Sequence, residues 1–274
     1  MKQLIDIINN TIKKREEIAL CTIVSTSGST PLKSGAKMLV WKSQVSYGTI
    51  GGGRIELKVT EDAVNAIEKK ESGLYEYNLI KEEMCCGGTV KIFIEPILRT
   101  KQLIIFGAGH IGSHIAYFAN KLNFKTVIVD ERYELLSKIT DVTAEKLNLS
   151  HHKAFSEIIT DEDTYIVIAT HLHEYDREIL AHYIGKKLGY LGMIGSKRKI
   201  IITRKKFLNQ NVCSEEELNS VDMPMGYNIG QNGPAEIALG IISKIVAVSS
   251  GKQINEENTL NEYEEAFVDS NGCI

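Results

Sequence analysis

The spacing of apolar residues along the chain changes near residue 100. Before it, short strand patterns alternate with two amphipathic helix patterns, at residues 2–16 and 54–70. After it, buried strand patterns alternate regularly with helical ones, which is typical of a parallel α/β sheet. We therefore predict a mixed α+β domain at residues 1–98 and a Rossmann-like parallel sheet with helices on both faces at residues 99–250. A polar, acidic tail follows at residues 251–274.

The strongest motif lies at the start of the second domain. A strand pattern leads into Gly107-Ala-Gly109-His110-Ile-Gly112, a helix pattern follows, and a second strand pattern ends on Asp130. This order is typical of dinucleotide-binding sites: the first glycine permits a tight turn, the second admits a pyrophosphate, and the third allows close helix packing. The helix N-terminus would bind phosphate, and the acid would bind a ribose hydroxyl. The alternative is a domain of Rossmann shape with a degenerate site.

Two glycine-rich segments of the first domain are further candidates. Gly51, Gly52 and Gly53 precede the helix pattern, and three consecutive glycines are costly in backbone entropy. They indicate positive φ angles or the close approach of a ligand, and the simpler interpretation is a tight strand-to-helix turn. Cys86 lies in a turn that reads MCCGG, where it is either an exposed thiolate or a small residue required by the turn.

Histidines follow two strand patterns of the second domain. His171, His173 and Asp176 come directly after a buried strand pattern, and ligands of open α/β sheets bind at the carboxyl ends of strands. Either histidine is a candidate proton carrier, which Asp176 could orient. The alternative is a helix cap at Asp176 beside a surface histidine. We interpret His151 and His152, after an earlier and weaker strand pattern, as solvated loop residues.

Three cations open another helix pattern. Gly195 and Ser196 precede Lys197, Arg198 and Lys199. Ser196 is a natural N-cap, but cations in a first helical turn oppose the helix dipole. Local stability gives no reason for them, so the binding of a phosphate or carboxylate is the simplest explanation.

Composition and charge narrow the class of protein. The net charge is −3, and 43% hydrophobic with 24% charged residues is ordinary for a globular protein. Nothing favours binding to nucleic acid or to an anionic membrane. We find no signal-peptide pattern and no apolar run near the roughly 20 residues that span a bilayer. Five cysteines argue against a disulfide framework, so we expect a cytoplasmic protein with reduced thiols.

Taken in order, the motifs resemble those of the xanthine dehydrogenase accessory factors, the XdhC/CoxI family. In the first domain the resemblance rests on GSTP at residues 28–31, on Gly51-Gly52-Gly53 with Glu56, and on Cys86-Gly-Gly. In the second it rests on FGAGH ending at His110, on Asp130 with Arg132, on Thr-His171 with Asp176, on IGSKRK at residues 194–199, and on PAEIA at residues 234–238. The order of these motifs is specific, and it covers the chain through about residue 248.

The resemblance implies a maturation factor rather than an enzyme. Such proteins bind the molybdenum cofactor (molybdopterin), protect it while a cysteine desulfurase supplies its terminal sulfur, and assist its insertion into an apo molybdenum hydroxylase of the xanthine dehydrogenase type. The resemblance also implies a homodimer, and it marks Cys86 as a molybdenum ligand or sulfur-protecting thiol. Together, motifs and resemblance give these candidate cofactor-binding residues: Gly51, Gly52, Gly53, Glu56, Gly107, Gly109, His110, Gly112, Asp130, Gly195, Ser196, Lys197 and Arg198.

Two other classes of protein fit the glycine-rich turn. An NAD(P)-dependent oxidoreductase would use Asp130 on the ribose and His171 or His173 as proton donor, although the first domain shows no obvious substrate site for that chemistry. A regulatory protein would sense a dinucleotide without chemistry. It would be indifferent to the loss of Cys86 and of the cations that follow Ser196.

Overall fold

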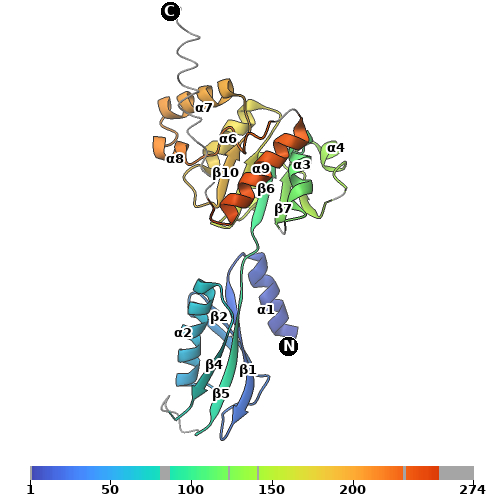
Figure 1. Cartoon of the computed structure of the whole chain (residues 1–274). Coiled ribbons are helices and arrows are strands. Elements are labelled where there is room, and N and C mark those ends of the chain that lie inside the picture. The colour runs from blue at the N-terminus through green and yellow to red at the C-terminus, as the bar shows by residue number, and fades with distance from the viewer. Residues whose placement is uncertain (1, 81–86, 123, 141, 231–232, 253–274) are drawn as a thin grey trace, which may run out of the picture. The chain divides into compact units, whose positions relative to one another are not determined.

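The chain forms two compact units that divide after Thr100 (Figure 1). The structure is a computed structural model that describes residues 2–80, 87–122, 124–140, 142–230 and 233–252. Each unit has its own sheet and its own apolar core. Within the described residues, no helix combines the length and apolar character needed to cross a membrane.

The first unit is a five-stranded antiparallel sheet in the order β3-β2-β1-β5-β4. Its strands are β1 (Ile18–Ser27), β2 (Lys37–Trp41), β3 (Ser46–Gly48), β4 (Gly73–Asn78) and β5 (Thr89–Ile97). Its helices are α1 (Lys2–Lys13) and α2 (Arg54–Lys69).

Alternation of side chains determines which face of this sheet α2 covers. In β5, Val90, Ile92 and Ile94 are buried, whereas Lys91 and Phe93 between them are exposed. Because successive side chains of a strand point to opposite faces, one face of the sheet is apolar. The buried stripe of α2 packs on that face through Ile55, Val59, Ala63, Ala66 and Ile67. The helix predicted at residues 54–70 is therefore confirmed.

The second unit is a parallel sheet with helices on both faces, which confirms the predicted Rossmann-like fold. The strand order is β10-β9-β6-β7-β8. The strands are β6 (Gln102–Phe106), β7 (Lys125–Val129), β8 (Ala144–Leu147), β9 (Thr164–Ile168) and β10 (Tyr190–Met193). The helices are α3 (His110–Ala119), α4 (Tyr133–Leu136), α5 (His151–Glu157), α6 (His173–Tyr183), α7 (Lys197–Asn209), α8 (Glu215–Asn219) and α9 (Pro234–Ser249).

Two apolar clusters cover the two faces of this sheet. Leu103 and Ile105 of β6 contribute to the cluster with α3, α4 and α9, whereas Ile104 and Phe106 contribute to the cluster with α5 to α8. Every residue of β6 is buried, which explains why its sequence is a continuous apolar run rather than an alternation. Figure 1 shows α9 lying along α3, the helix that follows the glycine turn.

The strand order brings two distant segments to the same edge of the sheet. β6 pairs with β7 on one side and with β9 on the other, so the chain changes direction across the sheet at the β6–β9 pair. The glycine turn follows β6, and Thr170 and His171 follow β9. Ligands of open α/β sheets bind outside the carboxyl ends of strands at such a switch point.

His151 and His152 depart from the prediction of two solvated loop residues. They are the first two residues of α5, and the side chain of Ser150 caps that helix. His151 is 8% exposed and packs on the ring of Tyr175, whereas the side chain of His152 is 66% exposed. The prediction of a loop is wrong for both residues. The prediction of solvent exposure is wrong for His151, because its burial comes from a tertiary contact with α6 that has no local sequence pattern.

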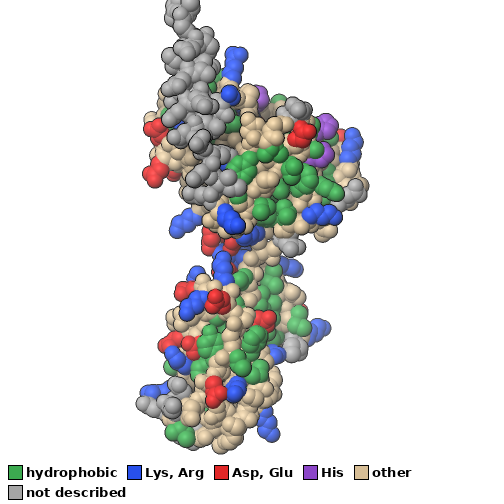
Figure 2. All heavy atoms as spheres, in the orientation of Figure 1, with side chains coloured by type: hydrophobic (Ala, Val, Ile, Leu, Met, Phe, Trp, Pro, Cys, Tyr) green, Lys and Arg blue, Asp and Glu red, His purple; other side chains and the backbone are tan. Residues whose placement is uncertain are grey.

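Charges of both signs are interspersed on the described face of each unit that Figure 2 shows. The net charge of the whole chain is small, at −3. This visible face therefore does not form a continuous basic surface of the kind that binds nucleic acid.

Gly226 determines how closely the segment between α8 and α9 approaches α9. Its φ is +91°, and a Cβ at this position would lie 2.8 Å from the backbone nitrogen of Ile241. We expect Gly226→Ala to lower the free energy of unfolding by about 3 kcal/mol, because positive φ and overpacking each cost about 1–2 kcal/mol. Urea denaturation followed by circular dichroism measures the loss.

Gly230→Ala is the matched control for this prediction. Gly230 has a similar φ of +84°, but a Cβ there would meet no atom within 4 Å. The control should lower the free energy of unfolding by only about 1 kcal/mol, which is the cost of positive φ alone. Equal losses in the two variants would show that the close approach to α9 contributes nothing.

Candidate functional site

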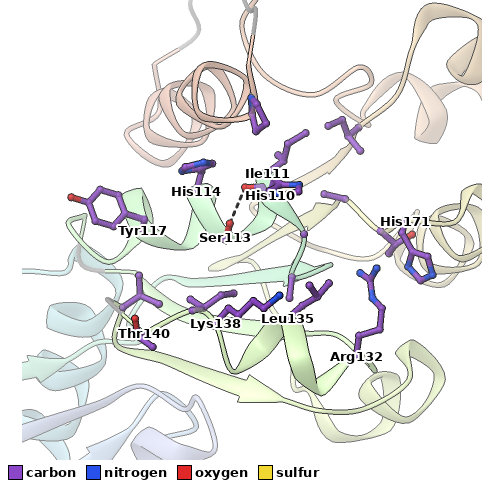
Figure 3. Close-up of a pocket in the computed structure, with 18 residues that line it drawn as sticks. His110, Ile111, Ser113, His114, Tyr117, Arg132, Leu135, Lys138, Thr140 and His171 are labelled. Carbon is purple, nitrogen blue, oxygen red and sulfur yellow. Dashed lines mark hydrogen bonds between the residues drawn. The ribbon is translucent and has the colours of Figure 1, made fainter.

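A cavity of about 830 Å³ opens at the carboxyl edge of the parallel sheet (Figure 3). Its walls come from the glycine turn and α3, from the segments that follow β7, β9 and β10, and from the start of α9. In Figure 3, Tyr117 and Thr140 lie at one end of the cavity, and Arg132 and His171 lie at the other. Its volume is in the range of small-molecule and cofactor sites, about 300–1,000 Å³.

Two of the three motif glycines are required by the protein's own backbone. Gly107 has a φ of +115°, and a Cβ there would lie 2.2 Å from the carbonyl oxygen of Ala169. A Cβ at Gly112 would lie 1.9 Å from the carbonyl oxygen of Gly107. The first glycine lets the ends of β6 and β9 meet, and the third lets α3 pack on the turn. Neither requirement by itself indicates a ligand.

Gly109 differs from the other two glycines of the motif. A Cβ there would meet no atom within 4 Å, and its φ of −69° suits any residue. Gly109 is also the N-cap of α3, and it caps the helix without a side-chain hydrogen bond. The space that a Cβ would fill therefore borders the amide groups of a helix N-terminus, which suit an anionic ligand.

Asp130 is engaged within the protein through both carboxylate oxygens. Oδ2 accepts hydrogen bonds from the backbone nitrogen of Ala108 and from Nη2 of Arg132, both at 2.7 Å. Oδ1 accepts from the backbone nitrogen and Nε of Arg132, both at 2.9 Å. Burial opposes the ionised form of Asp130, but these hydrogen bonds outweigh it and lower the pKa. Asp130 thus ties the end of β7 to the glycine turn, and its role as a ribose acceptor stays a prediction.

Basic side chains line the large cavity, and two of them, Arg132 and Lys138, are permanent cations. Arg132 and Lys138 come from the segment after β7, His110 and His114 from α3, and His171 from the segment after β9. Among the described residues that line this cavity, none is an aspartate or glutamate. Because the N-terminus of α3 opens into the same space, the cavity suits a phosphorylated or otherwise anionic ligand.

Asp176 and Lys199 form a buried ion pair between α6 and α7. Asp176 also accepts hydrogen bonds from the backbone nitrogen and hydroxyl of Thr170, at 3.1 and 2.7 Å. Lys199 also donates to the carbonyl oxygen of Ile194 at 2.8 Å, and a Cβ at Gly195 would lie 2.9 Å from the Lys199 side chain. The interpretation of Lys199 as a cation that binds an external anion is therefore wrong, because Asp176 of α6 neutralises its charge within the fold.

The three residues that precede Lys199 are exposed, unlike the buried ion pair that Lys199 forms. Ser196 caps α7 by accepting a hydrogen bond from the backbone nitrogen of Lys199 at 3.3 Å, which confirms the predicted N-cap. Lys197 and Arg198 are exposed, and neither is among the described residues that line the large cavity. Their predicted role in binding an anion, with that of Gly195, stays a prediction.

The two candidate proton carriers have different surroundings. His171 lines the large cavity and also a smaller one of about 30 Å³, which Gly107 and Asp130 line as well. His173 is the exposed first residue of α6 and is not among the described residues that line either cavity. Since Asp176 bonds to Thr170 and Lys199 instead, the expected pairing of Asp176 with His173 is wrong.

In the first unit, Glu56 organises the triple-glycine loop. Gly51, Gly52 and Gly53 have φ angles of +135°, +74° and +67°, so the predicted positive φ is confirmed. Oε1 of Glu56 accepts hydrogen bonds from the backbone nitrogens of Ile50 and Gly52, at 3.0 and 2.9 Å. Burial opposes ionisation of Glu56, but the hydrogen bonds to it lower its pKa. These contacts support the tight-turn interpretation, and cofactor binding by the loop stays a prediction.

Cys86, the predicted thiolate, lies outside the described residues. The segment that directly follows it packs on the loop after β1. A Cβ at Gly88 would lie 2.4 Å from the carbonyl oxygen of Ser29, and a Cβ at Gly28 would lie 3.2 Å from Cα of Gly88. The GSTP motif at residues 28–31 therefore meets the segment that follows Cys86 within the first unit.

Several residues of the large cavity were not predicted from the sequence. His114 follows His110 by four residues, so both lie on one face of α3, and this spacing was a usable signal. Lys138 and Thr140 follow the short helix α4. Their position depends on how the segment after β7 folds back on the sheet, and no local sequence pattern encodes that path.

We expect removal of the charge on Asp130 to destabilise the fold in a pH-dependent way. Asp130→Asn should lower the free energy of unfolding at pH 7 by about 2–3 kcal/mol, because it leaves the Arg132 side chain, 28% exposed, without its counter-ion. The folded-state pKa of Asp130 is lowered, so the stabilisation is present above the unfolded value of about 3.9 and is lost as pH falls through the folded value. Urea denaturation should show a constant difference in the free energy of unfolding between wild type and Asp130→Asn from about pH 5 to 8. This difference should shrink below about pH 4. A difference that grows with acidity would contradict this account.

We expect Lys199→Met to lower the free energy of unfolding by about 3 kcal/mol, because it leaves the fully buried carboxylate of Asp176 unpaired. Arg198→Met is the matched control, since Arg198 is exposed and adjacent in the same helical turn. The control should change stability by no more than about 0.5 kcal/mol. Thermal and urea denaturation of the two variants make the comparison, and a similar loss in both would show that the ion pair is not responsible.

Comparison with known proteins identifies relatives of both units. Residues 103–245 match the XdhC Rossmann domain, and residues 11–78 match the XdhC and CoxI family. The uncharacterized protein YqeB of Escherichia coli (strain K12) is 31% identical over 241 residues, which cover 85% of this chain and 43% of YqeB. A probable xanthine dehydrogenase subunit of Bacillus subtilis (strain 168) is 27% identical over 163 residues, which cover 58% of this chain and 46% of that protein. This chain spans about half the length of these curated relatives.

A solved structure shares the fold across both units. A crystal structure described as a xanthine dehydrogenase from Bacillus halodurans is 20% identical to this chain, with a TM-score of 0.50. The likeness covers 94% of this chain and 99% of that one, and at this identity it concerns the fold alone. The glycine turn, Asp130 and the Asp176–Lys199 pair all lie within the match to the XdhC Rossmann domain. On these matches, the chain belongs to the XdhC and CoxI family.

Proposed function

We propose that this protein is an accessory factor of a molybdenum hydroxylase of the xanthine dehydrogenase type, and that it binds the molybdenum cofactor as cargo. The observation that carries the proposal is the large cavity at the glycine turn. There a helix N-terminus, open space beside Gly109 and a lining with basic but no described acidic side chains come together. Two comparisons support the molybdenum cofactor among the possible anionic ligands. One is membership of the XdhC and CoxI family, and the other is the name of the Bacillus subtilis relative.

The residues of the cavity fit the chemistry of this cargo. The molybdenum cofactor is a phosphorylated pterin that holds its metal through a dithiolene, so it carries negative charge. The first turn of α3 beside Gly109 would receive the phosphate, and Lys138 would supply compensating charge. Arg132, whose charge Asp130 balances, would offer its remaining N–H groups as hydrogen-bond donors. In the hydroxylase, the bound cofactor supplies the molybdenum centre at which substrate is oxidised. In this chain, the cavity would hold the cofactor, orient it and limit its contact with water.

The surroundings of Asp130 favour this proposal over a nicotinamide-dependent oxidoreductase. An acid that binds a ribose needs acceptor capacity directed at the ligand. Here each carboxylate oxygen of Asp130 already accepts two hydrogen bonds from the protein. Asp130 holds the guanidinium of Arg132 at the edge of the cavity, and an arginine at that position suits a phosphorylated ligand.

The proposal extends to two protein partners and to the thiol of Cys86. The apo hydroxylase would receive the cofactor, and a cysteine desulfurase would supply its terminal sulfur. The factor would act as a homodimer in the cytoplasm. Cys86 would bind molybdenum or protect the sulfur, since a thiolate is a soft ligand for such a metal. Support for these roles comes from the family rather than from distances in the described residues.

Gly109→Ala tests the proposal with little risk to the fold. Its φ of −69° suits alanine, and the added methyl group meets no protein atom. The methyl group would occupy the space proposed for the phosphate, so we expect at least a tenfold weaker affinity for molybdenum cofactor freed from a purified hydroxylase. Retention of the cofactor through gel filtration measures the loss, and circular dichroism and melting temperature should match those of wild type.

Two further variants give this experiment its controls. Lys206→Met removes an exposed cation of α7 outside the cavity lining, and it should retain the cofactor as wild type does. Lys138→Met removes a cation of the lining and should weaken retention. Full retention by a folded Gly109→Ala protein would refute binding at the glycine turn. NAD(P)H binding with hydride transfer, without binding of the cofactor, would favour the oxidoreductase.

A further inference from the structure

A cluster of two histidines and a glutamate lies beside the glycine turn, outside the lining of the large cavity. His151 and His152 are the first two residues of α5, and Glu178 lies in the second turn of α6. The three residues offer ligand atoms that all lie within 4.8 Å of one another. α5 and α6 pack against each other, so the fold itself brings the three side chains together.

Both imidazoles approach the same carboxylate oxygen. Nε2 of His151 lies 2.6 Å from Oε2 of Glu178, and Nε2 of His152 lies 3.3 Å from it. The two rings are 4.1 Å apart between centroids. Ligand atoms of a tetrahedral zinc site lie roughly 3.3 Å apart, because zinc–nitrogen and zinc–oxygen bonds are about 2.0–2.1 Å long. Small side-chain rotations would therefore convert this arrangement into a coordination shell.

The surroundings of the cluster hold the His151 side chain in place and leave His152 and Glu178 free to rotate. His151 is 8% exposed and packs on Tyr175 and Phe155, at centroid distances of 4.7 and 5.7 Å. The side chain of His152 is 66% exposed, and that of Glu178 is 40% exposed. A site with one fixed imidazole and two groups that can rotate onto the ion is accessible from solvent.

We propose that His151, His152 and Glu178 bind a divalent transition metal ion of the zinc class and thereby fasten α5 to α6. Two imidazole nitrogens and one carboxylate oxygen suit Zn²⁺ better than Ca²⁺ or Mg²⁺, which prefer shells of oxygen ligands. Three protein ligands leave a fourth position for water. This site is independent of the cargo proposed for the large cavity.

Of the three residues of the cluster, only His151 lines the small cavity. His151 lines this cavity together with Gly107, Asp130 and His171. Its volume of about 30 Å³ exceeds the roughly 10–15 Å³ that one water needs. The small cavity can therefore hold a water beside His151 and the glycine turn.

Metal titration of the full-length protein tests the proposal. The chain is first stripped of metal with a chelator, and its accessible cysteines are blocked with iodoacetamide so that their thiolates do not compete. Cys21 is buried in the folded protein and needs no blocking. Zn²⁺ is then titrated against a chromogenic chelator. We expect one equivalent of Zn²⁺ per chain in wild type, and at least tenfold weaker binding in His152→Ala and in Glu178→Gln. Co²⁺ in the same site should give visible d–d absorption that both variants lose.

His173→Ala is the matched control, because His173 is an exposed histidine on the same helix as Glu178 but outside the cluster. It should bind Zn²⁺ as wild type does. Melting temperatures measured in the presence of chelator check that the variants fold. His152→Ala should fold as wild type does, because the side chain of His152 is largely exposed. Wild type without a Zn²⁺ equivalent, or equal affinity in wild type, His152→Ala and Glu178→Gln, would refute the site and leave a simple His–Glu hydrogen bond.

Discussion

The carboxylate of Asp130 connects the parts of the second unit that form its cavity. It accepts a hydrogen bond from the backbone of Ala108, which fixes the glycine turn after β6 against the end of β7. It also holds the guanidinium of Arg132, which places a cation at the cavity edge. A residue that the dinucleotide motif marks as a ligand contact is here a structural brace. The position of the N-terminus of α3, and with it the proposed anion site, depends on this brace.

The Asp176–Lys199 pair plays a similar part on the other side of the switch point. It joins the starts of α6 and α7, and through Thr170 it fixes the segment that follows β9. Both buried carboxylates thus position backbone at the carboxyl edge of the sheet. Asp130 and Asp176 are both turned inward and paired, and neither lines the large cavity. The cations and amides that remain suit an anionic cargo.

The sequence predicted the parts of this site that rest on local patterns. Continuous apolar runs gave the buried strands, three glycines gave the turn, and Ser196 gave a helix cap, because each feature is imposed by neighbours in the chain. Partners distant in sequence could not be predicted in this way. Lys199 looked like an anion ligand because Asp176 lies in another helix, and His151 looked solvated because its contacts lie on α6. Ion pairs between residues of different helices keep Asp176 and Lys199 out of the cavity lining, and no local sequence pattern predicts such pairs.

The central claim is that the glycine turn of this XdhC-family protein holds a molybdenum-bearing pterin rather than a nicotinamide dinucleotide. The most direct measurement is the identity of the small molecules released from protein purified out of a molybdate-replete host, by pterin fluorescence after oxidation, by elemental analysis and by mass spectrometry. The account predicts an oxidised pterin and molybdenum released together in proportion to protein. A nicotinamide dinucleotide released without pterin or molybdenum would contradict it.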